Sequence, residues 1–148
     1  MNPSFLDVSF FGAQSTRCEL FPRVLLVDDE PEILSATAQL LAWTGFTVTA
    51  VNSAEDAIVK LQIETFDLVV TDFRLGGKQG DAVVMAARNT CPATPVVLIT
   101  GLVNDLPGWM TSEEFALPVV TKPFRIAELL SAAKRAVAET RAESVACG

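Results

Sequence analysis

The stretch RVLLVDDEP, at residues 23–31, decides the fold of this chain. Its four consecutive aliphatic residues are typical of a buried β-strand. Two aspartates follow directly, and Pro31 then suits the first turn of a helix. The stretch therefore predicts a strand, an acidic turn and a helix in immediate succession.

The same alternation of strand and helix continues along the chain. Further strands are predicted at residues 47–51, 67–71, 95–100 and 119–121, and helices are predicted to start near residues 31, 54, 80 and 126. Residues 102–117 contain Pro107, Gly108 and few periodic aliphatic residues, so a fourth helix there should be short or irregular. Alternating elements of this kind predict an α/β domain with a five-stranded parallel sheet.

The two ends of the chain fall outside this alternation. Residues 1–22 lack the basic segment and the continuous apolar segment of a secretory signal. We expect them to be a poorly ordered N-terminal extension. We assign residues 23–140 to one domain and residues 141–148 to a C-terminal tail. No apolar run approaches the roughly 20 residues that cross a bilayer, so no membrane contact is expected.

The composition excludes several classes of function. The formal net charge is -7, whereas nucleic-acid binding requires clustered basic residues. The chain has no histidine, which rules out histidine-based acid–base catalysis and histidine-ligated metals. Its three cysteines have no CxxC spacing, which predicts free thiols in a reducing cytoplasm.

Polar residues gather at the predicted carboxyl ends of the strands, where open parallel sheets bind ligands. They are Asp28 and Asp29 after the first strand, Asp72 after the third, Thr100 at the end of the fourth and Lys122 after the fifth. Crowded carboxylates repel one another unless a cation joins them, and Mg²⁺ prefers oxygen ligands. A carboxylate can also attack phosphorus while a metal and a lysine neutralise the phosphoryl oxygens. Each residue alone is more often a turn or strand residue, so the joint placement carries the prediction of Mg²⁺-dependent phosphoryl transfer.

Four short motifs together resemble the receiver domain of bacterial response regulators. They are VDDEP at residues 27–31, TD at 71–72, TG at 100–101 and KPF at 122–124. Gly80 falls where that family usually has a glycine at the start of the third helix. The resemblance spans residues 23–138 and implies a doubly wound, flavodoxin-like sheet with the strand order 2-1-3-4-5.

The resemblance also implies a role for each residue of the cluster. Asp72 would be the phosphoacceptor, and Thr100 and Lys122 would contact the transferred phosphoryl group. Mg²⁺ would be held by Asp28, Asp29, Asp72 and the backbone carbonyl of Arg74. The peptide bond before Pro123 is expected to be cis. In these terms the chain is a phosphoacceptor domain and not an enzyme.

The implied function is that of a stand-alone receiver domain. A histidine kinase or a histidine phosphotransfer protein would supply the phosphoryl group. No output domain is expected after the tail, so a downstream protein target would read the modified state, or the domain would compete for phosphoryl groups. No direct contact with nucleic acid is expected, and the chain should be a monomer or a weak dimer.

Two alternatives remain open. Val119 stands where receiver domains usually carry an aromatic switch residue, and Gly76 replaces a common proline in a loop expected to be mobile. With a degenerate fourth helix as well, the chain could be a pseudo-receiver that binds a partner without phosphorylation-driven switching. A Mg²⁺-dependent phosphatase with an aspartate nucleophile would need a second acid where this sequence has Arg74.

Overall fold

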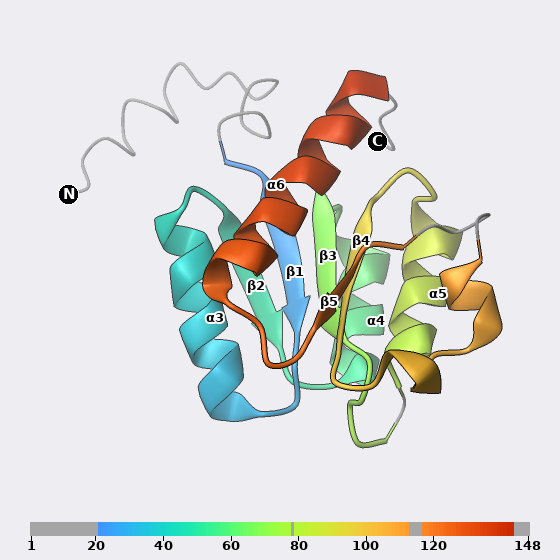
Figure 1. Ribbon diagram of the computed structural model, residues 1–148. Coiled ribbons are helices and arrows are strands. Elements are labelled where there is room, and N and C mark those ends of the chain that lie inside the picture. Colours follow the sequence, from blue (N-terminus) through green and yellow to red (C-terminus); the bar gives the residue numbers. More distant parts are fainter. Residues whose placement is uncertain (1–20, 78, 113–116, 144–148) are drawn as a thin grey trace, which may run out of the picture.

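Five parallel strands form one sheet in the computed structural model, which describes residues 21–77, 79–112 and 117–143 (Figure 1). The spatial order is β2-β1-β3-β4-β5, which confirms the implied order. The strands are β1 (Arg23–Val27), β2 (Thr47–Val51), β3 (Leu68–Asp72), β4 (Val96–Thr100) and β5 (Val119–Thr121). The third and fourth strands begin one residue later than predicted, and the third also ends one residue later, at Asp72.

Helices cover both faces of the sheet (Figure 1). They are α3 (Pro31–Trp43), α4 (Ala54–Ile63), α5 (Gly80–Thr90) and α6 (Ile126–Glu143). Helices α3 and α6 pack on one face, and α4 and α5 pack on the other. Local sequence explains the helix ends: Gly45 takes a φ of 109° just beyond α3, and the Ser53 hydroxyl accepts a hydrogen bond from the Asp56 N–H at the start of α4 (3.0 Å).

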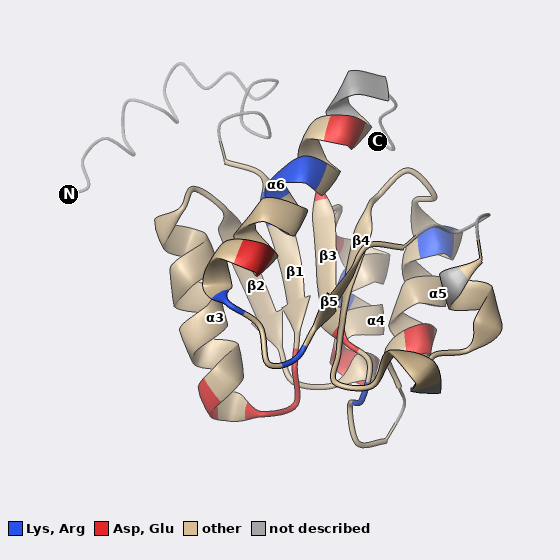
Figure 2. Cartoon of the chain, in the orientation of Figure 1, with Lys and Arg blue, Asp and Glu red and all other residues tan. Residues whose placement is uncertain are grey.

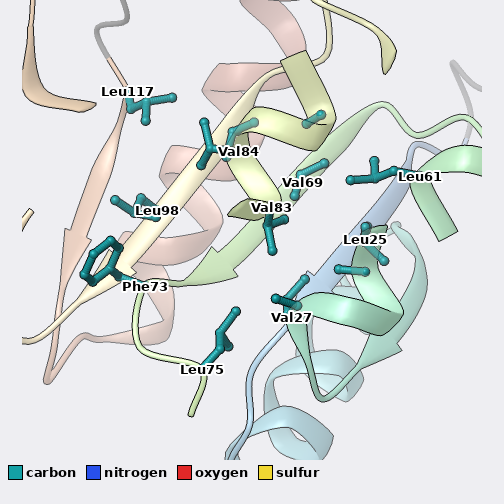
Figure 3. Packing of buried hydrophobic residues seen from close by; sticks show 14 of the residues in the cluster. Leu25, Val27, Leu61, Val69, Phe73, Leu75, Val83, Val84, Leu98 and Leu117 are labelled. Carbon is teal, nitrogen blue, oxygen red and sulfur yellow. The ribbon is translucent and has the colours of Figure 1, made fainter. Parts of the chain in front are cut away.

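The central strand β3 is buried along its whole length, because both of its faces meet hydrophobic cores. Val69 joins Leu25 and Leu98 in the core under α4 and α5 (Figure 3), whereas Leu68 and Val70 join the core under α3 and α6. Burying one such side chain contributes about 1.5–3 kcal/mol relative to leaving it exposed. The two cores therefore hold β1, β3 and β4 in register, with their carboxyl ends at one edge.

The segment between β4 and β5 confirms the expectation of a short or irregular fourth helix. Its described residues, 101–112 and 117–118, form two 3₁₀ turns, η1 (Val103–Asp105) and η2 (Gly108–Thr111), and no α-helix. Leu106, Met110 and Leu117 nevertheless bury their side chains in the core under α5. These residues thus pack into the core, although the two turns are too short to form a regular helical surface.

One prediction about the cysteines is wrong, and most predictions about the chain ends concern residues that the structure does not describe. Cys91, which follows α5, is disulfide-bonded, so the prediction of a free thiol is wrong there. Sequence spacing could not show this, because disulfide formation depends on proximity in the fold. Cys18, Cys147, residues 1–20 of the predicted extension and residues 144–148 of the predicted tail lie outside the described residues. None of the described helices combines the length and the apolar character that a bilayer span requires.

The connection from β3 to α5 passes through a close approach of two backbones at Gly80. A Cβ atom at this position would lie 2.5 Å from the carbonyl oxygen of Asp72 and 2.8 Å from the Cα of Phe73. The Gly80 N–H also donates to the Phe73 carbonyl (2.6 Å). Only glycine fits this contact, which places the first turn of α5 directly against the end of β3.

We predict that Gly80→Ala lowers the free energy of unfolding by about 2–3 kcal/mol, since the added methyl group would overlap backbone atoms that cannot move freely. Urea denaturation followed by circular dichroism measures this. Gly108→Ala is the matched control, because a Cβ there would meet no atom within 4 Å, and it should change stability by less than about 0.5 kcal/mol. Equal effects of the two substitutions would contradict the prediction.

Candidate functional site

Three carboxylates meet at the carboxyl edge of the sheet, as the sequence predicted. Asp28 and Asp29 follow β1, Asp72 is the last residue of the neighbouring strand β3, and one carboxylate oxygen from each lies within 4.8 Å of the others. Asp28 and Asp72 are buried, with 4% and 5% of their surface exposed, whereas Asp29 faces solvent. In Figure 2 the acidic residues are red at the lower edge of the sheet, where β1 ends, and basic residues, in blue, lie nearby. The fold therefore concentrates negative charge where burial makes it costly.

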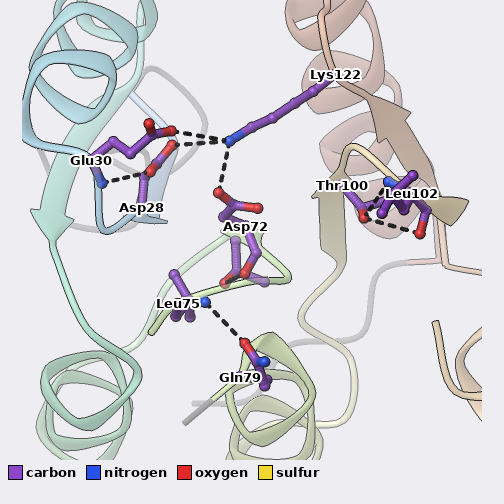
Figure 4. A network of polar contacts seen from close by, with 9 residues as sticks. Asp28, Glu30, Asp72, Leu75, Gln79, Thr100, Leu102 and Lys122 are labelled. Carbon is purple, nitrogen blue, oxygen red and sulfur yellow. Dashed lines mark hydrogen bonds and ion pairs between the residues drawn. The ribbon is translucent and has the colours of Figure 1, made fainter. Parts of the chain in front are cut away.

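Lys122 supplies the positive charge that accompanies these carboxylates. Its Nζ atom lies 2.7 Å from Asp72 Oδ2, 3.9 Å from Asp28 Oδ2 and 3.7 Å from Glu30 Oε1 (Figure 4). The Lys122 N–H donates to the Thr100 carbonyl (2.8 Å), which anchors its backbone at the end of β4. The Lys122–Pro123 peptide bond is cis, as the resemblance implied. One ammonium group thus links the ends of three strands.

Burial and charge shift the pKa values of two groups in this network. Burial raises the pKa of Asp28, although the N–H of Glu30 and the charge of Lys122 oppose the shift. For Lys122, burial would lower the pKa, but the hydrogen bond to Asp72 and the attraction of the three surrounding carboxylates outweigh it and raise the pKa. Lys122 therefore keeps its positive charge throughout the neutral range.

Thr100 lies at the end of β4, two strands from Asp28, and its side chain is buried. Its hydroxyl oxygen accepts a hydrogen bond from the Leu102 N–H (3.2 Å) and donates to the Leu102 carbonyl (3.4 Å). In Figure 4 these bonds turn the hydroxyl toward its own loop. The structure thus places Thr100 at the predicted edge and shows a partner that the sequence did not indicate.

The loop after β3 carries Arg74, whose side chain is exposed, and Leu75, whose side chain is buried. Gly76 then adopts a left-handed conformation with a φ of 79°. A Cβ at Gly76 would lie 3.7 Å from Asp29 Oδ2, so this turn passes beside the acidic cluster. The loop that contains the predicted backbone ligand is therefore adjacent to the carboxylates.

Two residues of the site were missed in the sequence. Glu30 contacts Lys122, and its backbone N–H donates to Asp28 Oδ1 (2.9 Å). Gln79 accepts a hydrogen bond from the N–H of Leu75 through its side-chain oxygen (3.0 Å). The position of Glu30 directly after the aspartate pair was a usable signal, whereas nothing in the sequence pointed to Gln79.

The donor atoms of the cluster fit a hard divalent cation. All the side-chain ligands are carboxylate oxygens within 4.8 Å of one another, the chemistry that Mg²⁺ prefers. Asp72 also presents a carboxylate that can act as a nucleophile, next to a lysine that can balance charge on a transferring group. The arrangement is thus suited to metal-assisted phosphoryl transfer.

Known proteins with similar sequences and structures are receivers and regulators. A family model described as "Response regulator receiver domain" matches residues 24–134. The C4-dicarboxylate transport transcriptional regulatory protein DctD of Rhizobium meliloti is 31% identical over 121 residues, which cover 81% of this chain and 26% of that protein. The transcriptional regulatory protein CpxR of Escherichia coli is 32% identical over 109 residues, covering 74% of this chain and 46% of that protein. The chain therefore spans about a quarter to a half of these curated relatives.

Solved structures give the same result at the level of the domain. A response regulator receiver protein from Sinorhizobium medicae has a TM-score of 0.73 and 31% identity, over 81% of this chain and 97% of that chain. A CheY-like receiver domain protein from Methanospirillum hungatei has a TM-score of 0.77 and 26% identity, over 84% of this chain and 99% of that chain. The shared region is thus nearly the whole of each solved domain.

We predict that Lys122→Met destabilises the Mg²⁺-free protein by about 1–3 kcal/mol, because it leaves buried carboxylates without their counter-charge. In an Asp72→Asn background the same substitution should cost less than half as much, since one of the carboxylates is then absent. Chemical denaturation of the four proteins gives the coupling. Lys60→Met is the control: Lys60 pairs with Glu64 at the surface, and its loss should cost less than about 1 kcal/mol. Additive effects at positions 122 and 72 would show that the pair does not interact.

Proposed function

Because the chain belongs to the family of response regulator receiver domains of two-component systems, we propose that Asp72 accepts a phosphoryl group from a histidine kinase or a histidine phosphotransfer protein. The observation that supports this most directly is the contact of Asp72 with Lys122 inside a cluster of three carboxylates. We assign this function to residues 23–140 and propose a cytoplasmic location for it.

In the proposed reaction an oxygen of the Asp72 carboxylate attacks the phosphorus of a phosphohistidine. The new O–P bond forms as the P–N bond breaks. The electron pair of the P–N bond returns to the imidazole nitrogen of the donor. Lys122 remains protonated and balances negative charge on the phosphoryl oxygens. The Thr100 hydroxyl, which now bonds to Leu102, would turn to donate to one of these oxygens.

We propose that the acidic cluster holds Mg²⁺ through Asp28, Asp29, Asp72 and the backbone carbonyl of Arg74. When bound, Mg²⁺ would draw negative charge away from the transferring oxygens. Without a cation, Asp28 would repel an incoming phosphoryl group. The raised pKa of Asp28 supports a cation at this site, because burial beside other acids disfavours the negative charge of Asp28 and a bound cation would offset that cost.

We propose that the modified domain signals through contact with a downstream protein target, with no direct role for nucleic acid or membrane. The domain would act as a monomer or a weak dimer. Its chemistry would be confined to its own phosphorylation and dephosphorylation.

Incubation with a small phosphodonor such as phosphoramidate and Mg²⁺ should add the mass of one phosphoryl group to the intact protein. Asp72→Asn should abolish the addition, because the nucleophile is lost, and intact mass spectrometry measures both. Asp56→Asn is the matched control: this carboxylate lies at the exposed start of α4, and its variant should be modified like the wild type. An unmodified wild type, or equal modification of Asp72→Asn, would argue against Asp72 as the acceptor.

A pseudo-receiver is the second candidate, favoured by Val119 in place of an aromatic residue and by the two 3₁₀ turns that precede β5 in the chain. Beryllofluoride with Mg²⁺ mimics the phosphoryl group. If the chain is a switch, this mimic should change its affinity for a binding partner by at least about fivefold. The partner to use is a protein first isolated by its binding to the Mg²⁺-saturated chain. Calorimetry with and without beryllofluoride measures the change. Equal affinities in the two states would favour the pseudo-receiver.

A further inference from the structure

The peptide unit between Arg74 and Leu75 carries both an anchored N–H and the carbonyl proposed as a metal ligand. The N–H of Leu75 donates to the side-chain oxygen of Gln79 at 3.0 Å (Figure 4). The only cis peptide bond among the described residues is Lys122–Pro123, so the unit is trans. In a planar trans peptide the C=O and the N–H point in opposite directions. The hydrogen bond that Leu75 donates to Gln79 therefore fixes the direction of the Arg74 carbonyl, on the side away from Gln79.

Gln79 occupies the N-cap position of α5. The side chain of an N-cap residue ordinarily accepts a hydrogen bond from the first turn of the helix. Glutamine is not a favoured N-cap residue, and the Gln79 side chain makes no cap hydrogen bond. The backbone N–H groups in the first turn of α5 have other acceptors. The Ala82 N–H donates to Asp81 Oδ1 (2.9 Å) and to the Gln79 carbonyl (3.1 Å), and the Gly80 N–H donates to the Phe73 carbonyl. The Gln79 side chain is thus left to reach back four residues to the loop.

The residues on either side of the Arg74–Leu75 peptide are anchored by contacts of their own. The N–H of Phe73 is held by the Ile99 carbonyl of β4 (2.8 Å), and the side chain of Leu75 is buried in the core. Gly76 and Gly77 have no side chains that could brace the turn beside Asp29. A peptide between two anchored residues can still rotate as a plane, and the Gln79 bond opposes that rotation.

We propose that Gln79 is a positioning residue that orients the Arg74 carbonyl toward the divalent-cation site. The proposal rests on the proposed function, which assigns that carbonyl as a ligand. Residues that orient ligands without touching the ion commonly account for about 10–100-fold in metal affinity. Gln79 would therefore tune how tightly the receiver holds Mg²⁺ without contacting the ion or the phosphoryl group.

The test is Mg²⁺ titration of the full chain by isothermal calorimetry. Gln79→Met keeps the length of the side chain and removes the acceptor, and it should weaken Mg²⁺ binding about tenfold. Gln79→Glu keeps an acceptor oxygen and should bind Mg²⁺ within about threefold of the wild type. Gln39→Met, on the exposed surface of α3, controls for the exchange itself and should leave the affinity unchanged.

A second readout, in Mg²⁺-free protein, separates positioning from general stability. Amide hydrogen exchange of Leu75 should be faster in Gln79→Met than in the wild type, and its rate should return to the wild-type value in Gln79→Glu. The amides of β3 should exchange at wild-type rates in both variants. If Gln79→Met does not fold, Gln79→Asn carries the same expectation, because its shorter side chain cannot span to Leu75 yet can cap α5.

Wild-type Mg²⁺ affinity in Gln79→Met would overturn the inference, and so would an unchanged Leu75 exchange rate. Equal weakening in the methionine and glutamate variants would overturn it too, since the acceptor would then be irrelevant. Failure of the proposed function is distinguishable: in that case the wild type itself would show no Mg²⁺ binding and no phosphoryl addition at Asp72.

Discussion

The mutual repulsion of three carboxylates at one edge of the sheet is the constraint on which the rest of this structure depends. Two unit charges about 4 Å apart repel by on the order of 4 kcal/mol at the effective dielectric typical of protein sites, and these three lie within 4.8 Å. Two of them are also buried, which removes the screening of water. The fold tolerates the cluster because Lys122 reaches it from the end of β5, and the same excess of negative charge that strains the protein attracts a divalent cation.

Such a cluster can be held only by a rigid frame. The frame here is β3, buried on both faces between two hydrophobic cores, with Asp72 as its last residue. Gly80 brings the start of α5 against the backbone of Asp72 and Phe73, so Asp72 is backed by main chain on a second side. Stability and site geometry therefore share the same contacts, and packing near β3 acts directly on the position of Asp72.

The part of the site that the sequence predicted is the part that backbone topology determines. Asp28, Asp72 and Lys122 each lie at the carboxyl end of a short strand, and parallel strands necessarily bring these ends to one edge. The fold and strand order followed from the resemblance and the alternation of elements. What the sequence did not predict depends on side-chain rotamers: the Thr100 hydroxyl turned to Leu102, and Gln79 turned back to Leu75. The disulfide at Cys91 belongs with these, because no local pattern encodes distance in space.

The missing aromatic residue at position 119 leaves the Thr100–Leu102 contact as the device most directly coupled to the proposed phosphorylation. The Thr100 hydroxyl holds both the N–H and the carbonyl of Leu102. If that hydroxyl moved to a phosphoryl oxygen on Asp72, both bonds would be released at once, and the start of η1 would lose its tether to β4. Leu102 and Val103 already expose apolar side chains there, so a shift of this segment would rearrange an apolar surface beside the site. A hydroxyl that changes partner can thus couple charge at Asp72 to surface shape without a moving aromatic ring, because the described residues that follow Leu102 form two short turns that such a release would shift.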